Sequence, residues 1–475
     1  MNKMDSIRTN QVTKLKSRWK KNGQAMADDP NRTLKMAIWI YLFFWIFEGA
    51  LRKWVVPALS LPLLVVRDPI VLWLMIVSIR RGLLKFNIYL FGFLVLGILS
   101  AFTAMLLGHG NLGTAIYGAR TIVLYFPMMF VMGSVFDHED VIKMGKWILI
   151  LAIPMTLLIG LQFYSPQSAW VNRGVGGDIE GAGFGGALGY FRPPGTFSFT
   201  NGTTSFYSLV APFVIYFWLN PQKINRLILM GATGALLIAI PLSISRTLLF
   251  QVVLSVLFLL LAVSRNPKYF GKILLSAIGV ILALIVLSRM SFFQTATDAF
   301  NERFASANKT EGGLEGVLGE RFLGTLVKAV MGSADQSSFG YGIGSGTAVG
   351  ADLLKYDKIL ITADFEWMRE IAELGLMGLW LIIMRVGLAT KVGFASFRKL
   401  GKKDMLPWLL MSVGFLMVTQ GQLHQSTILG FVALVGGLWM ASLRKPARSQ
   451  IIKTANKNSR ANVASGPMVK KNNLG

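Results

Sequence analysis

The sequence predicts an all-α polytopic membrane protein with about twelve transmembrane helices, and three observations support this fold class. Hydrophobic residues make up 53% of the chain and charged residues only 15%, a balance typical of membrane proteins rather than soluble domains. The apolar residues fall into runs of membrane-spanning length. Lys and Arg gather in alternate turns and in both terminal segments, which is the distribution that orients membrane helices.

The same composition excludes several classes of function. The net charge of +25 lies largely in the terminal segments and short turns, and no nucleic-acid-binding motif accompanies it, so no nucleic acid partner is expected. The chain has no cysteine, which excludes disulfides, thiol catalysis and thiolate metal sites. With only three histidines we expect no His-rich metal centre and no cofactor. The N-terminal arm has no apolar h-region, so no cleavable signal peptide is expected.

In chain order, the sequence divides into a basic arm, a transmembrane domain and a basic tail. The arm, residues 1–35, is expected to lie on an anionic cytoplasmic membrane face. The transmembrane domain covers residues 36–443, and the tail, residues 444–475, is expected to be cytoplasmic and disordered. The predicted spans are Met36–Trp54, Leu63–Ile79, Phe86–Leu107, Arg120–Asp137, Met144–Phe163, a sixth ending at Asn220, a seventh ending at Ser243, an eighth ending at Arg265, Ile273–Leu287, Glu370–Thr390, Met405–Gln420 and a last one ending at Arg444.

This scheme places two long loops, residues 164–203 and 290–369, on the external side of the membrane. The second loop is the longest polar interval, and with Tyr341, Trp367 and charges of both signs it is expected to form an ordered cap. Its end is predicted to run as one helix from a carboxylate-rich turn into the tenth span. In the first loop, the glycines are compatible with a flexible linker. The Arg192-Pro193-Pro194-Gly195 run instead favours a rigid turn that presents Arg192.

Several arginines fall at the external ends of predicted spans. A cluster of guanidinium groups there could bind a phosphate or diphosphate, whose oxygens suit the planar fork. The alternative is that each arginine reaches its own head-group region. That alternative is favoured for Arg289, and both interpretations stay open for Arg67 because Asp68 offers a local partner. Ligand binding is favoured for Arg120 and Arg246, which lie next to apolar runs.

The cap also ends in a group of carboxylates. On a helix, Glu366, Glu370 and Glu373 share one face, and Arg369 is spaced to pair with Glu373. Carboxylates at a helix N-terminus are stabilised by the macrodipole, which accounts for at least one of them. Two acids near a lipid-facing cleft could instead supply a general base. The glycine-rich run at residues 340–347 lacks the Gly-Lys-Ser/Thr of a P-loop, so we expect a close-packed turn whose amides face a ligand.

The three histidines differ in their surroundings. His109 is expected to be a satisfied interface residue, and His138, among acidic residues on the cytoplasmic side, is expected to be solvated. His424 is flanked by Gln422 and Gln425 in an otherwise apolar hairpin, and it remains a candidate functional residue.

The order and spacing of four motifs resemble those of the O-antigen ligase and O-antigen polymerase superfamily of bacterial envelope proteins, over nearly the whole chain. The motifs are Gln162-Phe163-Tyr164-Ser165-Pro166 followed by Arg192-Pro193-Pro194-Gly195-Thr196-Phe197, Ser245-Arg246-Thr247, the glycine-rich run at 340–347, and Glu366-Trp367 leading to Glu373-Leu374-Gly375-Leu376-Met377-Gly378. The resemblance implies a GT-C-like membrane glycosyltransferase architecture with a periplasmic cap. It also implies a location in the bacterial inner membrane.

The resemblance further implies a reaction and a set of site residues. A glycan passes from an undecaprenyl diphosphate carrier to an acceptor glycan or to lipid A core, without a metal. Arginines bind the diphosphate, which suggests Arg120, Arg192 and Arg246. A loop histidine acts as the base in relatives, but Asp364 occupies that position here, so Asp364 and Glu366 become the catalytic candidates. Arg67, Glu373 and His424 are secondary candidates.

Other functions remain open. The choice between polymerase and ligase is not decided by the motifs. A transporter or flippase for a lipid-linked glycan is the main alternative, although the sequence shows no related halves and its polar residues gather at one face rather than mid-membrane. A third possibility is a structural subunit of an export complex, which would not require a cluster of arginines and carboxylates.

Overall fold

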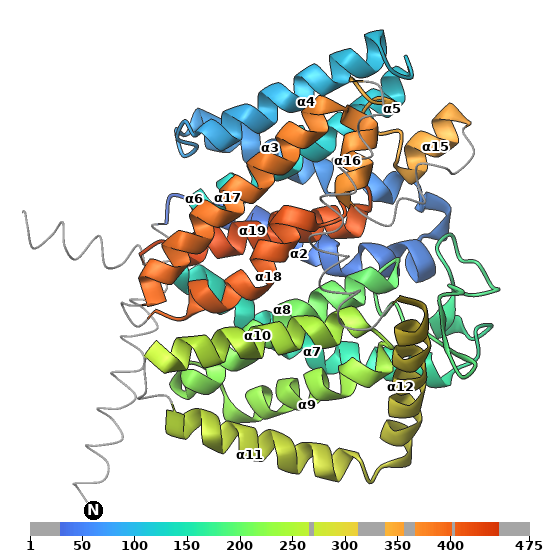
Figure 1. Cartoon of the computed structure of the whole chain (residues 1–475), viewed down its shortest axis with the longest axis vertical. Helices are drawn as coiled ribbons and strands as arrows, with labels where there is room; N and C mark the ends of the chain where they lie inside the picture. The colour runs from blue at the N-terminus through green and yellow to red at the C-terminus, as the bar shows by residue number, and fades with distance from the viewer. Residues whose placement is uncertain (1–28, 266–269, 312–337, 356–365, 401–403, 446–475) are drawn as a thin grey trace, which may run out of the picture.

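The computed structural model describes residues 29–265, 270–311, 338–355, 366–400 and 404–445. These residues are almost entirely helical (Figure 1), with one antiparallel strand pair, β1 (Gly185–Ala187) and β2 (Tyr190–Phe191). The helices are α2 (Arg32–Ala50), α3 (Asp68–Arg80), α4 (Ile88–Leu106), α5 (Leu112–Arg120), α6 (Phe126–Val135), α7 (His138–Tyr164), α8 (Thr200–Leu219), α9 (Arg226–Leu242), α10 (Arg246–Arg265), α11 (Phe270–Leu287), α12 (Ser291–Glu311), α15 (Ala348–Leu354), α16 (Glu366–Leu374), α17 (Leu376–Leu400), α18 (Leu406–Gln420) and α19 (Ser426–Ser442).

The length and composition of the helices confirm an all-α membrane protein. Within the described residues, eight helices are long and apolar enough to cross a membrane: Arg32–Val55, Pro62–Arg80, Ile88–Leu106, Leu112–Val135, His138–Tyr164, Thr200–Leu219, Arg246–Arg265 and Leu376–Leu400. Three further apolar helices, α9, α18 and α19, are shorter. Large apolar side chains such as Ile98 and Phe102 on α4 face outward, as lipid-contacting surfaces require.

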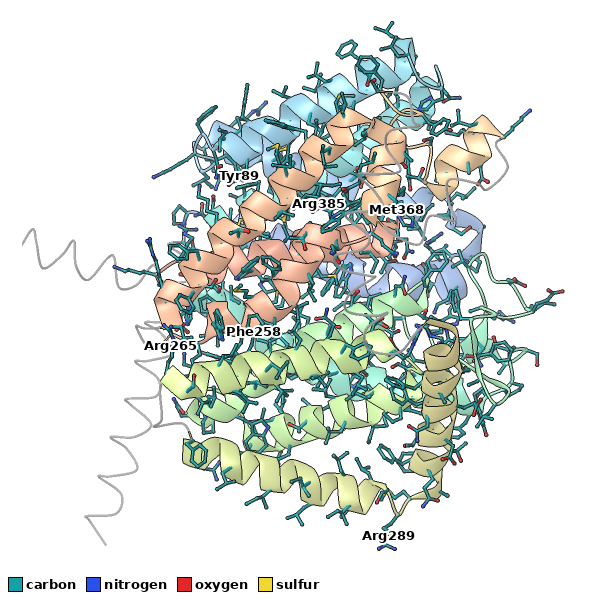
Figure 2. The ribbon with its side chains drawn as sticks, in the orientation of Figure 1. Tyr89, Phe258, Arg265, Arg289, Met368 and Arg385 are labelled. Carbon is teal, nitrogen blue, oxygen red and sulfur yellow. The ribbon has the colours of Figure 1, made fainter. Side chains whose placement is uncertain are left out.

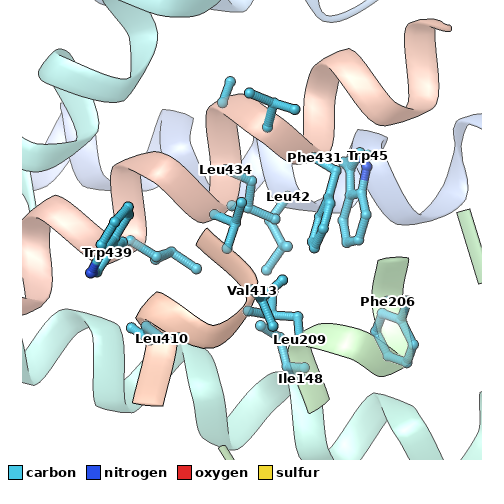
Figure 3. Packing of buried hydrophobic residues seen from close by; sticks show 14 of the residues in the cluster. Leu42, Trp45, Ile148, Phe206, Leu209, Leu410, Val413, Phe431, Leu434 and Trp439 are labelled. Atoms are coloured by element: carbon cyan, nitrogen blue, oxygen red, sulfur yellow. The ribbon is translucent and has the colours of Figure 1, made fainter. Parts of the chain in front are cut away.

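Helix α19 forms the centre of the bundle. Its residues are almost all buried against α6, α8 and α18, and Phe431 stacks on Trp45 of α2 with ring centroids 5.2 Å apart (Figure 3). A Cβ at Gly437 would lie 2.6 Å from Cβ of Met132, so glycine is what allows α6 to approach this closely.

The segments that flank the candidate site gather at one end of the bundle. In Figure 1, α12, α15, α16 and the segment that joins α7 to α8 lie towards the right. Arg265, at the end of α10, lies at the opposite end from Arg289 (Figure 2).

Several predicted helix boundaries are wrong. The helix expected to run from the acidic turn into the tenth span is broken at Gly375, whose φ of +59° ends α16 before α17 begins, and α17 extends to Leu400 rather than Thr390. The fourth span begins at Leu112 rather than Arg120, because the Asn111 side chain caps the helix there by accepting the Thr114 N–H. A π-helical turn, Thr121–Tyr125, then precedes α6.

Candidate functional site

Helix α16 carries four buried ionisable side chains, Glu366, Arg369, Glu370 and Glu373, and Arg369 pairs with two of the carboxylates. The Arg369 guanidinium donates from Nη2 to Glu366 Oε1 at 2.6 Å and from Nη1 to Glu373 Oε1 at 2.5 Å. Burial of these charges is tolerated because each has an opposite charge within hydrogen-bonding distance. The predicted pairing of Arg369 with Glu373 is therefore present, and Arg369 also binds Glu366.

Glu366 joins α16 to the turn between α18 and α19. Its Oε1 accepts the Leu423 N–H at 2.8 Å, and its Oε2 lies 3.2 Å from His424 Nδ1. Burial alone would raise the pKa of Glu366, but the Arg369 charge and the His424 hydrogen bond outweigh it and hold this pKa well below its usual range. An ionised carboxylate at Nδ1 favours the tautomer whose Nε2 is unprotonated, so Nε2 of His424 is the nitrogen able to accept a proton.

Two further side chains fix this turn against α16. The Trp367 indole N–H donates to Thr419 O at 2.8 Å. Arg385 of α17 forms an ion pair with Glu370 and donates to Val418 O at 2.8 Å and to Gly421 O at 2.9 Å. Figure 2 labels Arg385 on α17 and Met368 on α16, two helices that pack against each other. These bonds hold His424 in place on the end of α16.

The carboxylate of Glu373, a secondary candidate, binds backbone N–H groups of the glycine-rich loop. Its carboxylate accepts the N–H groups of Gly344 and Gly346 at 3.1 and 2.7 Å. Tyr341 N–H also donates to Ala372 O, so the loop wraps around the C-terminal end of α16. The expectation that the loop amides face a ligand is therefore wrong for these two amides, because they bind a carboxylate of the protein itself.

A small cavity lies between α16, the glycine-rich loop and the turn between α18 and α19. Its polar lining comes from four elements, which place hydroxyl, carboxylate, guanidinium and imidazole groups around it. The lining residues are Gly118, Thr121, Ile122, Ile343, Thr347, Arg369, Glu370, Glu373, Leu374, Leu381, Leu423 and His424.

A second group of charges consists of three arginines from separate elements. Arg192 follows β2, Arg246 opens α10, and Arg303 lies on α12 and donates to Gly186 O at 3.2 Å. Burial, together with the positive charges of Arg303 and Arg246, lowers the pKa of Arg192 to about 10. The Arg192 Nε is buried and has no hydrogen-bond partner among the described residues. The three side chains, here called the arginine cluster, form a site suited to an anion.

Hydrogen bonds fix the turn after Arg192, and another bond joins the start of α8 to Gln425, the neighbour of His424. Gly195, in the turn after Arg192, donates its N–H to Gln162 Oε1 at 2.7 Å, and its carbonyl accepts from Lys53 Nζ at 2.6 Å. At the start of α8, Asn201 Nδ2 donates to Gln425 Oε1 at 2.9 Å. The turn is held from two sides, which favours the rigid interpretation of the Pro-Pro-Gly run over a flexible linker.

Arg120 and Arg67 belong to a different charge network. Arg120 Nη1 lies 2.7 and 3.0 Å from the two carboxylate oxygens of Asp68, and Arg67 Nε lies 3.1 Å from Glu48 Oε2. Arg67 also donates to Ser426 O at 2.6 Å. Both charges are neutralised inside the protein, so the structure favours a structural role for these two arginines and does not bring Arg120 into the arginine cluster.

Asp364 lies outside the described residues. His109 accepts the Asn111 N–H at Nδ1 and lies 3.2 Å from Ile343 O, and His138 bonds Ser442 O, so both bind backbone. In the part of the chain that the structure describes, no group of three or more His, Asp or Glu side chains could hold a metal ion.

No family model, curated protein or solved structure matches this chain.

Proposed function

We propose that the protein is a membrane glycosyltransferase of the bacterial inner membrane. It would take a glycan from an undecaprenyl diphosphate carrier and join it to an acceptor glycan or to lipid A core at the periplasmic face. The observation that carries this proposal is the pairing of His424 with Glu366, next to Gln425, which binds Asn201 at the start of α8, the helix that follows the turn bearing Arg192. A proton acceptor and an anion site are the two functions that such a transfer needs.

The arginine cluster supplies the anion site. A diphosphate carries its negative charge on oxygens that match the guanidinium fork, and three arginines from different elements can bind it from several directions. Burial is the main cause of the lowered pKa of Arg192, and repulsion from Arg303 and Arg246 adds to it; an anion that binds between the three relieves this repulsion. The same contacts stabilise the charge that develops on the leaving diphosphate.

His424 supplies the base. Its Nε2 removes the proton from the acceptor hydroxyl as that oxygen attacks the anomeric carbon, and the bond between this carbon and the diphosphate oxygen breaks. Glu366 orients the imidazole and stabilises the imidazolium that forms, as the carboxylate does in other carboxylate–histidine pairs. Because its pKa is lowered, Glu366 suits this orienting role better than the role of base that the sequence suggested.

Complementation of a deletion strain tests this proposal. Surface glycan length and amount are compared for the wild-type chain and for His424→Ala and Arg246→Ala, at matched membrane levels. We expect both variants to lose the glycan. The matched controls are His138→Ala and Arg289→Ala, which change the same residue types outside the site and should complement fully. Normal glycan in both site variants would overturn the proposal.

A further inference from the structure

Glu370 is a buried carboxylate that the proposed transfer does not use. It is 1% exposed, and its Oε1 pairs with Arg385. Its Oε2 is buried and has no hydrogen-bond partner among the described residues. A buried carboxylate oxygen without a partner is costly, so its presence calls for a functional explanation.

The cavity described above connects Glu370 to His424. Both residues line it, together with the hydroxyls of Thr121 and Thr347. Each hydroxyl donates its hydrogen to a carbonyl, Thr121 to Gly118 O and Thr347 to Gly344 O. The Thr347 oxygen also accepts the Gly350 N–H. Because a hydroxyl oxygen has two lone pairs, each of the two oxygens can still accept a hydrogen bond from water. A polar cavity lined in this way suits ordered water.

The chemistry of the proposed transfer leaves a proton at His424. The acceptor hydroxyl loses its hydrogen as its oxygen bonds the anomeric carbon, and the diphosphate departs as an anion, so each transfer releases one proton. That proton is left on Nε2 of His424. Glu366 is a poor acceptor for it, since its pKa lies below the usual range. The histidine must lose the proton before the next transfer.

We propose that Glu370 receives this proton from His424 through water in the cavity and passes it on to solvent. The inference rests on the proposed function. The proton moves from Nε2 to a cavity water and from that water to Glu370 Oε2, so that His424 becomes neutral again. No bond to the substrate is made or broken in this step.

The charges around Glu370 suit this role. Glu366, Arg369 and Glu373 face it from α16, Arg385 from α17, and His424 from the turn between α18 and α19. Burial raises the pKa of Glu370 to about 7, and the charge of Glu366 acts in the same direction, while Arg385 and Arg369 oppose it. A carboxyl group that titrates near neutral pH can both accept and release a proton.

The test uses purified full-length protein in nanodiscs, with donor lipid extracted from the deletion strain as the probe. For Glu370→Gln we expect a first turnover close to that of the wild type, followed by a steady-state rate lower by about tenfold, because His424 stays protonated. Formate, a small carboxylate, should partly restore the steady-state rate. His424→Ala should lose the first turnover as well, which separates a failure of the relay from a failure of the proposed function.

Two results would overturn the relay. One is a steady-state rate and pH profile of Glu370→Gln equal to those of the wild type while His424→Ala is inactive. The other is loss of the first turnover in Glu370→Gln without rescue by formate, which indicates a structural role. If Glu370→Gln does not fold, the infrared carboxyl band of the wild type, followed on either side of pH 7 and compared with Glu370→Asp, supplies the answer. A band that does not titrate in that range contradicts the inference.

Discussion

His424 Nδ1 lies 3.2 Å from Glu366 Oε2, although 58 residues separate the two in the sequence. The contact brings the turn between α18 and α19 onto the start of α16. Both carboxylate oxygens of Glu366 have hydrogen-bond partners, which are Arg369, the Leu423 N–H and His424. The imidazole therefore has its orientation fixed on one side and its other nitrogen available.

The first prediction separates the roles of these two residues. His424→Ala should reduce the rate of glycan transfer by about 10²–10⁴-fold, the usual contribution of a positioned base. Glu366→Gln should also reduce it, because an amide no longer stabilises the imidazolium. The comparison is Asp364→Asn, at the position where members of the family that the sequence resembles carry their histidine. Full activity in His424→Ala together with loss in Asp364→Asn would assign the base to Asp364 instead.

A second prediction concerns the arginine cluster. Arg246→Lys keeps the charge but loses the two-pronged fork, so the KM for the donor should rise while some activity remains, and Arg246→Ala should lose more. Arg303→Ala should raise the same KM. Kinetics with extracted donor lipid measure both effects. An unchanged KM in Arg303→Ala would remove this residue from the anion site.

A third prediction distinguishes Arg120 from that cluster. Because Arg120 and Asp68 form a largely buried ion pair, Arg120→Met should lower the free energy of unfolding by about 3 kcal/mol. Its effect on donor KM should be small in the protein that remains folded. Thermal unfolding in detergent of Arg120→Met, Asp68→Asn and the double variant forms a double-mutant cycle, which measures the interaction free energy of the ion pair. Additive effects would show that the pair contributes nothing.

The pH dependence of stability provides a fourth prediction. The pKa of Glu370 is raised from 4.5 to about 7, so between these values the folded state binds more protons than the unfolded state. Stability therefore falls as the pH rises through this window. Glu370→Gln should remove that part of the slope, seen as a smaller change of Tm between pH 4.5 and 7. An identical slope in the variant would mean that Glu370 does not titrate there.

A fifth prediction tests the break between α16 and α17. A Cβ at Gly375 would lie 2.2 Å from Ser338 O, and the φ of +59° disfavours any other residue. Gly375→Ala should therefore destabilise the protein by more than about 1 kcal/mol. Gly234→Ala on α9, where a Cβ meets no atom within 4 Å, is the matched control and should leave stability unchanged or improve it. Equal Tm values for the two variants would contradict this account.

The fold was largely predictable because membrane helices are encoded locally. Apolar runs such as the one around Ile98 on α4 need no tertiary contact to be recognised. The boundaries were less predictable. Gly375 is a visible signal for a helix end, since glycine is common just beyond the last helical turn, and the predicted continuous helix neglected it.

The site was only partly predictable because its contacts are long-range. The residue types at Arg192, Arg246 and Glu366 suggested an anion site and acid–base chemistry, but nothing local relates Glu366 to His424. Arg303 was missed, since an arginine on a polar helix such as α12 has no feature that distinguishes it from a solvated one. Arg120 pairs with Asp68, which the sequence suggested only as a local partner of its neighbour Arg67. The packing of α3 against the turn Thr121–Tyr125 brings Asp68 to Arg120, and the sequence does not reveal this long-range contact.

We propose that this protein breaks the bond between a glycan and undecaprenyl diphosphate. The most direct test incubates the purified protein in nanodiscs with donor lipid from the deletion strain and measures the free undecaprenyl diphosphate released together with the transferred glycan. We predict release and transfer in equal amounts for the wild type, and neither for His424→Ala. Donor lipid that stays intact after incubation with the folded wild-type protein would contradict the proposed transfer. Movement of the intact donor across a vesicle membrane would favour a flippase instead.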